Sequence, residues 1–241
     1  MQCLILAAGY ATRLSPLTDN FPKPLLDVKG RTILDWLLDD LEANAAIDKY
    51  IVISNHKYAG HFDKWSETRP GRIVVVDDGT STNETRLGAV RDMEYALKET
   101  GLEDDTLVMA GDNLLDFSLA PFIDYFKAKG ASCVMRYEEP DTARLSKCGV
   151  ITINDEEKVL SMVEKPACPP SRWCVPPFYC YTRRDIALVS QALRDGCGTD
   201  APGSYAAWIA AHSVLYAMKM PGKRRDIGNL ASYLEACGEQ K

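Results

Sequence analysis

The sequence predicts an α/β fold whose first half is built from parallel strand, helix, strand units and whose second half adds an antiparallel extension. Short apolar runs such as 50–54, 73–77 and 106–110 alternate with stretches that have helical spacing, which is the pattern of parallel βαβ units. Beyond residue 131 the strand-like runs follow one another through short links, which favours antiparallel pairing. These two patterns together define the fold class.

The first half begins with an apolar run that starts at Leu4 and breaks into the small residues Ala7, Ala8 and Gly9. Such a break predicts a buried strand that enters a tight loop. Apolar and acidic residues then alternate at helical spacing over 32–41, which predicts the first crossover helix. The other elements expected in this half are strands at 50–54, 73–77 and 106–110 and helices at 56–65 and 87–100.

The second half contains apolar runs at 149–153 and 159–163 that are joined by four polar residues, which predicts a hairpin. Helical spacing resumes at 185–193 and at 205–211, and Ser204 is the expected N-cap of the second of these helices. The other elements expected here are strands at 132–137 and 214–220 and a closing helix at 230–236.

Charge and cysteine usage limit the classes of partner. The 28 basic and 34 acidic residues give a net charge of −6, and phosphate backbones are bound by clustered Lys and Arg, so we expect neither a nucleic-acid nor a membrane partner. The start of the chain lacks the basic and then hydrophobic pattern of a signal peptide, so we expect a cytoplasmic location. The eight cysteines include no CxxC pair, which favours free thiols over a zinc site or a disulfide framework.

The loop after the first strand carries the features of a polyphosphate site. Small residues up to Gly9 expose backbone N–H groups, which together favour an anion. Arg13 and Lys23 add two cations, one able to hold phosphate oxygens in bidentate fashion and the other a compact point charge. Three prolines within 14–26 favour an ordered, non-helical course for this segment.

This stretch resembles the signature of the sugar-1-phosphate nucleotidyltransferases, GxGxRLxPLTxxxPKPL, and most of all the glucose-1-phosphate thymidylyltransferases. Ala11 stands where the family usually has a second glycine. The resemblance implies a Rossmann-like, three-layer, GT-A-like domain with a mixed sheet flanked by helices and a small antiparallel extension. It implies one domain over 1–241, with a nucleotide-binding half at 1–130 and an acceptor-binding half at 131–241. The matching residues are Gly9, Thr12-Arg13-Leu14, Pro16-Leu17-Thr18 and Pro22-Lys23-Pro24-Leu25.

Two aspartates are the candidate ligands of Mg²⁺. Asp112 directly follows the predicted strand 106–110, and ligands bind at the carboxyl ends of strands in open α/β sheets. Magnesium prefers a few carboxylates together with waters and phosphate oxygens, so a second carboxylate is needed. Asp226 is our candidate because it follows the last predicted strand and resembles the family's late W-x-D-x-G segment.

The resemblance also assigns the nucleotide and acceptor sites. The position 83–85 resembles the family's base-reading loop, although Arg86 follows where the family often has glycine. The expected nucleotide-binding residues are Leu6, Ala7, Ala8, Gly9, Arg13, Asn83, Glu84 and Thr85.

Glu164-Lys165 resembles the family's EKP element, in which Glu binds sugar hydroxyls and Lys the sugar phosphate, and Gly149 resembles the glycine beneath the sugar ring. The segment 174–179 departs from the family, since a doubled proline replaces a small polar turn. The expected acceptor-binding residues are Asn113, Gly149, Glu164, Lys165 and Tyr179.

The reaction that these residues imply is attack of a phosphomonoester oxygen on the α-phosphorus of a nucleoside triphosphate, with release of pyrophosphate. A phosphomonoester has its second pKa near ~6 and therefore needs no general base at neutral pH. The protein must still align the two substrates and compensate their negative charge. Arg13, Lys23 and Asp112 are the expected catalytic residues.

Two alternative functions stay open, and assembly into a homo-oligomer is also open. The doubled proline at 176–177 permits a phosphorylated alcohol or amine as acceptor, such as phosphocholine with CTP. An aromatic cage of Trp173, Phe178 and Tyr179 would then hold the quaternary ammonium. The second alternative is a non-catalytic protein that senses nucleotides. A sensor would not require both candidate metal carboxylates, which argues against it.

Overall fold

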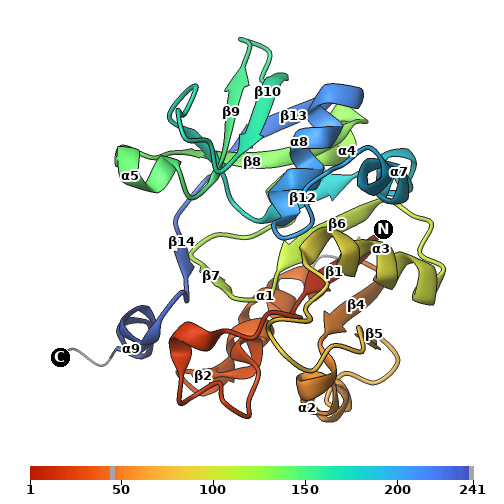
Figure 1. The fold of residues 1–241 in the computed structure, drawn as a ribbon, viewed down its shortest axis with the longest axis vertical. Helices are drawn as coiled ribbons and strands as arrows, with labels where there is room; N and C mark the ends of the chain where they lie inside the picture. Colours follow the sequence, from red (N-terminus) through yellow and green to blue (C-terminus); the bar gives the residue numbers. More distant parts are fainter. Residues whose placement is uncertain (44–46, 239–241) are drawn as a thin grey trace. The chain divides into compact units, whose positions relative to one another are not determined.

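The structure, a computed structural model, describes residues 1–43 and 47–238, and the chain divides into two compact units (Figure 1). Unit 1 comprises Met1, 87–109 and 121–220, and unit 2 comprises 2–86, 110–120 and the remainder from 221. Both units combine helices with strands, so the predicted mixed α/β class is confirmed. No helix in the described ranges is long and apolar enough to cross a membrane.

Unit 2 contains the first three strands that the sequence predicts as parallel. The fourth, expected over 106–110, lies mostly in unit 1 and pairs there with 178–181 in antiparallel orientation. In the sheet β1 lies beside β4 and β4 beside β5, both in parallel, with Leu4 opposite Ile51 and Ile51 opposite Val74. The buried β-branched residues of β4 fill both faces, as a covered parallel strand requires. The elements are β1 (Gln2–Leu6), β4 (Lys49–Ser54), β5 (Ile73–Asp77), α1 (Ile33–Glu42), α2 (His56–Ser66) and α9 (Leu230–Cys237).

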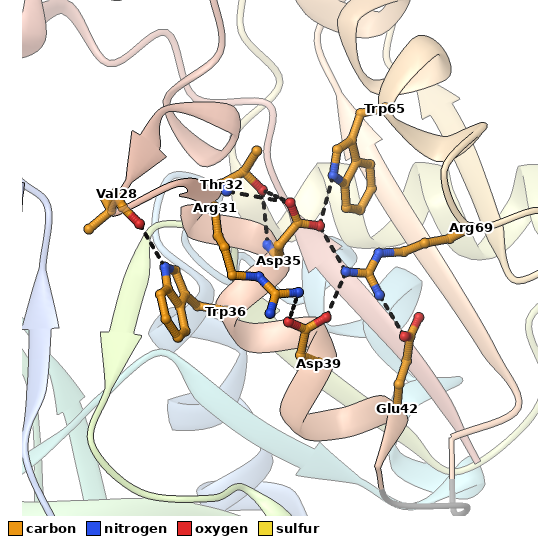
Figure 2. Close-up of polar contacts among 9 residues, drawn as sticks. All are labelled: Val28, Arg31, Thr32, Asp35, Trp36, Asp39, Glu42, Trp65 and Arg69. Atoms are coloured by element: carbon orange, nitrogen blue, oxygen red, sulfur yellow. Dashed lines mark hydrogen bonds and ion pairs between the residues drawn. The ribbon is translucent and has the colours of Figure 1, made fainter.

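Helix α1 begins at a capping box, because the Thr32 side chain accepts a hydrogen bond from the backbone N–H of Asp35, whose carboxylate in turn accepts from Thr32. Its buried face packs against the segment of Lys23 and against β7. Its acidic face binds the guanidinium of Arg69, which lies 2.9 Å from Asp35, 2.8 Å from Asp39 and 2.5 Å from Glu42 (Figure 2). These ion pairs attach the end of the α2 segment to three successive turns of α1.

Short elements complete unit 2, and two of them correct a prediction. The segment 14–26 is not wholly non-helical, because 3-10 helices form at η1 (Thr12–Leu14) and η2 (Lys23–Leu25). Pro24 fits η2 because it lies in the first turn, where no partner is needed for its missing N–H. Two antiparallel ribbons pair β2 (Asp27–Val28) with β3 (Arg31–Thr32) and β7 (Asn113–Leu115) with β14 (Arg224–Asp226).

Unit 1 holds a mixed sheet in the order β10-β9-β11-β8-β12-β6, in which neighbours are antiparallel and β13 pairs with β8 in parallel. The predicted hairpin of β9 and β10 is confirmed. Strands β11 and β12 follow one another along β8, interrupted at the two prolines 176 and 177, which lack the N–H that a ladder needs. The strands are β6 (Thr106–Ala110), β8 (Ser132–Glu138), β9 (Gly149–Ile153), β10 (Val159–Glu164), β11 (Trp173–Val175), β12 (Phe178–Tyr181) and β13 (Leu215–Lys219).

The helices of unit 1 correct two predictions. The single helix expected over 185–193 is split, because the carbonyl of Asp185 accepts both the Tyr205 hydroxyl and the Leu188 N–H, which ends the first helix. Ser204 is not an N-cap, since α8 begins earlier, with Pro202 in its first turn. The helices are α3 (Ala89–Thr100), α4 (Ala120–Lys129), α5 (Thr142–Leu145), α6 (Arg183–Ile186), α7 (Val189–Arg194) and α8 (Pro202–His212).

Candidate active site

The loop after β1 leaves Gly9 exposed, whereas the two alanines before it are buried. The N–H of Ala7 donates to the carbonyl of Ile53 at 2.9 Å, so this N–H is not available to a phosphate. The amide of the buried Asn55 donates to the carbonyl of Ala8 at 2.9 Å and accepts from the first turn of α2. The loop is therefore anchored on its buried side and open at Gly9.

The position where the family usually has its second glycine has a left-handed backbone. Ala11 has φ 48° and ψ 38°, a region that glycine enters without the steric cost that a Cβ brings. The hydroxyl of Thr18 donates to the carbonyl of Ala11 at 2.9 Å and helps to hold this conformation. Arg13 follows in η1 and its side chain is exposed.

The ammonium of Lys23 joins two segments of unit 2. It pairs with the carboxylate of Asp112 and donates to the carbonyl of Ile227 at 2.9 Å. The N–H of Ile227 in turn donates to the carbonyl of Asp112 at 3.2 Å. The lysine side chain is largely buried, so its charge faces these two partners in a low-dielectric setting.

Asp226 lies beside Asp112 because the β7 and β14 ribbon places it opposite Asn113. Its carboxyl remains accessible to solvent, yet the surrounding protein desolvates it, and this burial together with the charge of Asp112 raises its pKa. The charges of Lys23, Arg224 and Arg13 act in the opposite direction. The four charged residues that the sequence singled out thus share one electrostatic environment in unit 2.

The two carboxylates form a donor set that suits Mg²⁺. Over residues 1–43 and 47–238, no group of three or more His, Cys, Asp and Glu side chains is arranged so that it could hold a metal ion. Two carboxylates match the preference of Mg²⁺ for oxygen ligands. The raised pKa of Asp226 has burial as its main cause and the neighbouring charge of Asp112 as the second. Asp112 and Asp226 therefore fit a divalent ion such as Mg²⁺ and would hold it through their carboxylate oxygens.

The expected base-reading residues lie in a tight turn of unit 2. The N–H of Thr85 donates to the carbonyl of Thr82 at 3.1 Å, and Arg86 folds back to donate to the carbonyl of Asn83 at 2.9 Å. Asn83 also lines a cavity of about 490 Å³ together with Tyr10 and residues of the loop after β1. Glu84 is exposed next to it.

The expected acceptor residues other than Asn113 lie in unit 1. Glu164 at the end of β10 is opposite Gly149 at the start of β9, and burial raises the pKa of its carboxyl. Lys165 follows with φ 48° and an exposed side chain, and its N–H donates to the carbonyl of Cys148 at 2.9 Å. The structure therefore brings three of the predicted residues together at one end of the hairpin.

Tyr179 and its aromatic neighbours are already packed. Only 3% of Tyr179 is exposed, and its ring stacks on Tyr181 with centroids 6.0 Å apart. Phe178 is fully buried, and the guanidinium of Arg136 lies 4.3 Å from the centroid of the Trp173 ring. These three side chains do not form an open cage for a quaternary ammonium ion.

Three positions that matter for this geometry escaped the sequence prediction. Asn55 holds the loop after β1, and the only cue in the sequence is an Asn at a helix start. Ile227 contributes its backbone, which no residue type reveals. The Glu164 carboxylate occupies the place where a Cβ of Gly203 would lie, and the Pro-Gly-Ser context indicates only the start of a helix.

A model of the family described as nucleotidyl transferase matches residues 2–240. The UTP--glucose-1-phosphate uridylyltransferase AglF of Haloferax volcanii is 29% identical over 187 residues, which cover 76% of this chain and 72% of that protein. A glucose-1-phosphate adenylyltransferase of Fervidobacterium nodosum is 24% identical over 96% of this chain and 59% of its own length. The chain spans about half the length of other curated relatives, such as a UTP--glucose-1-phosphate uridylyltransferase of Synechocystis at 45%.

Solved structures agree in fold. A UDP-glucose pyrophosphorylase complexed with UDP-glucose has a TM-score of 0.82 at 20% identity, covering 98% of this chain and 97% of that one. A UTP-bound UGPase from Acinetobacter baumannii has a TM-score of 0.75 at 19% identity, covering 98% and 91%. Because the family model matches nearly all of the chain, the protein belongs to the nucleotidyl transferase family.

Proposed function

We propose that this protein joins a nucleoside triphosphate to a sugar 1-phosphate, forming a nucleoside diphosphate sugar and pyrophosphate. The observation that carries the proposal is the placement of Lys23 against Asp112, with Asp226 beside it in the same unit. Phosphoryl chemistry needs alignment and charge compensation, and one ammonium next to two carboxylates supplies both a cation and a metal site. Relatives with names of this class support the choice of a sugar 1-phosphate.

In this proposal each charged residue has one task. Arg13 and the backbone at Gly9 hold the triphosphate, and Lys23 neutralises charge at the α-phosphate as the acceptor oxygen attacks in line. Asp112 and Asp226 would hold Mg²⁺, which supplies further charge neutralisation at the phosphates when bound. No side chain takes a proton, because the acceptor phosphate is largely dianionic at neutral pH.

In this proposal four acceptor-binding residues belong to unit 1, and Asn113 is the fifth. The buried carboxylate of Glu164 would accept hydrogen bonds from sugar hydroxyls, and the exposed ammonium of Lys165 would pair with the sugar phosphate. Gly149 would let the sugar approach the backbone, and Tyr179 would act through its packing against Tyr181. The aromatic side chains at 173, 178 and 179 are already packed against other residues and leave no open cage for a quaternary ammonium ion, which favours a sugar phosphate over phosphocholine.

We further propose one nucleotidyltransferase domain over 1–241, with a nucleotide-binding half at 1–130 and an acceptor-binding half at 131–241. We place it in the cytoplasm, where its eight free cysteines would stay reduced.

A panel that crosses ATP, CTP, GTP, UTP and dTTP with sugar 1-phosphates and phosphocholine tests the function, with pyrophosphate read out by a coupled pyrophosphatase. We expect release with at least one sugar 1-phosphate. Release with phosphocholine alone would instead support a cytidylyltransferase of small phosphomonoesters. Binding of a nucleotide without release from any pair would support a nucleotide sensor.

A further inference from the structure

The carboxylate of Glu164 lies against two glycines from different elements of unit 1. A Cβ placed on Gly203 in α8 would lie 2.0 Å from Oε2, 2.9 Å from Cδ and 3.5 Å from Oε1 of Glu164. A Cβ placed on Gly149 in β9 would lie 2.7 Å from Cε of Met162 and 2.8 Å from the same Oε2. Helix α8 packs on β10 (Figure 1). The space left by the missing side chain at Gly203 is the space that the Glu164 carboxylate uses.

The contact at Gly203 involves one flexible side chain only. Apart from the adjoining residues and the nearby backbone of α8, the three heavy atoms nearest to a Cβ at this position all belong to Glu164. Gly203 is the second residue of α8, and its φ is not in the positive range that requires glycine. Alanine has the higher helix propensity, so the fold has no reason of its own to place glycine here.

We propose that Gly203 is a positioning residue of the acceptor site, because its missing Cβ leaves the space in which the Glu164 carboxylate must lie to bind the acceptor's hydroxyl groups. The inference rests on the role proposed above for Glu164. A Cβ at Gly203 forces the carboxylate into another rotamer without disturbing the backbone of α8. A misplacement of about 1 Å at a positioned group can lower the efficiency of the reaction about 100-fold.

The matched control is Gly60 in α2. It is also a helical glycine without positive φ, it is exposed, and a Cβ there would meet no atom within 4 Å. Replacing either glycine by alanine should therefore leave the melting temperature unchanged or raise it by about 2–4 °C. The two variants should differ only in their use of the acceptor.

The experiment measures kcat and KM for both substrates in Gly203→Ala, Gly60→Ala and the double variant Gly203→Ala/Glu164→Asp. We expect Gly203→Ala to raise the KM of the acceptor about 10- to 100-fold while the KM of the nucleoside triphosphate stays within about twofold. Shortening the carboxylate by one methylene should restore much of the loss in the double variant. Gly60→Ala should match the wild type.

Three results would overturn the proposal. These are wild-type kinetics in Gly203→Ala, an equal loss for both substrates, and loss of folded structure, since the last would mean that more than one side chain has to move. NMR titration of the Glu164 carboxyl gives a readout that needs no turnover. If the carboxyl is pushed into solvent, its pKa falls toward the ordinary glutamate value in Gly203→Ala, and this shift would persist even if the panel above identified no reaction.

Discussion

Lys23 and Asp112, which are 89 residues apart in the sequence, form an ion pair in unit 2. The same ammonium donates to the carbonyl of Ile227, so it connects the second residue after β6 with the residue after β14. One side chain thus holds the two segments that carry the candidate metal ligands. Its position is defined by the folded chain before any substrate binds, which is the preorganisation that charge stabilisation requires.

Replacing Lys23 by alanine should lower pyrophosphate release by about 10²- to 10³-fold, because the compensating charge is lost. Asp112→Ala should have an effect of the same order through the metal site. Circular dichroism should show folded protein in both cases. Lys64→Ala, on the exposed face of α2, is the control and should retain full activity. Near-normal turnover in either active-site variant would exclude the proposed mechanism.

Replacing Asp226 by asparagine should stabilise the protein at neutral pH in the absence of Mg²⁺. Burial and the charge of Asp112 raise the pKa of Asp226 in the folded state, so the folded protein binds this proton more readily than the unfolded chain. The stability of the folded protein therefore falls as the pH rises from 3.8, the ordinary pKa of an aspartate, through the raised pKa of Asp226. Because the carboxyl is accessible, we expect a difference of about 1 kcal/mol or less.

Urea unfolding at a series of pH values measures this effect. The difference between wild type and Asp226→Asn should disappear below the ordinary carboxyl pKa. Asp63→Asn, on the surface of α2, should show no such pH dependence. A variant less stable than the wild type at neutral pH would contradict the electrostatic reading of the carboxylate pair.

Mg²⁺ should raise the melting temperature of the wild type, since a ligand that binds only the folded state stabilises it. At ten times the dissociation constant the gain is about 1.4 kcal/mol, which corresponds to a few degrees for a chain of this length. Asp226→Asn should lose most of this shift, and EDTA should reverse it in the wild type. An equal shift in both proteins would place the metal elsewhere.

The parts of this fold that follow from local patterns were predictable from the sequence. The apolar runs of β4 and β5 and the Thr32 cap of α1 carry their signals within a few residues. Elements that form only through contacts with distant parts of the chain were not predictable. The ribbon of β7 and β14 has three residues in each strand, and its second strand reads as a basic run.

The candidate site divides in the same way. The sequence motifs pointed to Lys23, Asp112 and Asp226, and the structure places these three in one unit. The carbonyl of Ile227 and the space at Gly203 have no sequence signal, because one is a backbone atom and the other an absent side chain. Their importance emerges only from the surrounding atoms.

Replacing Arg69 by methionine should lower the free energy of unfolding by about 3 kcal/mol. The guanidinium is largely buried and binds Asp35, Asp39 and Glu42 on one face of α1, so its loss removes an ion-pair partner from each of these carboxylates (Figure 2). Asp35 keeps its hydrogen bonds from Thr32 and Trp65, and Asp39 keeps its pair with Arg31. Urea unfolding measures the loss. If the variant were as stable as the wild type, the cluster would contribute nothing to the attachment of α1.

Arg144→Met is the control for Arg69. Its pair with Asp141 is exposed and 3.6 Å long, and such pairs contribute about 0–1 kcal/mol. The pH dependence should differ as well. Although burial opposes it, hydrogen bonds from Thr32, Arg69 and Trp65 lower the pKa of Asp35, so stability is lost as the pH falls, and this loss should be smaller in Arg69→Met.

Replacing Ala11 by glycine should stabilise the protein by about 0.5–1 kcal/mol. A left-handed conformation costs a residue with a Cβ about 1–2 kcal/mol, and the greater freedom of glycine in the unfolded chain offsets part of the gain. Ala43→Gly tests the sign, because Ala43 is right-handed, with φ −66° and ψ −17°, and glycine there should destabilise. Urea unfolding of the two variants measures both effects, and a destabilised Ala11→Gly would mean that the Cβ of Ala11 contributes more by packing than its backbone conformation costs.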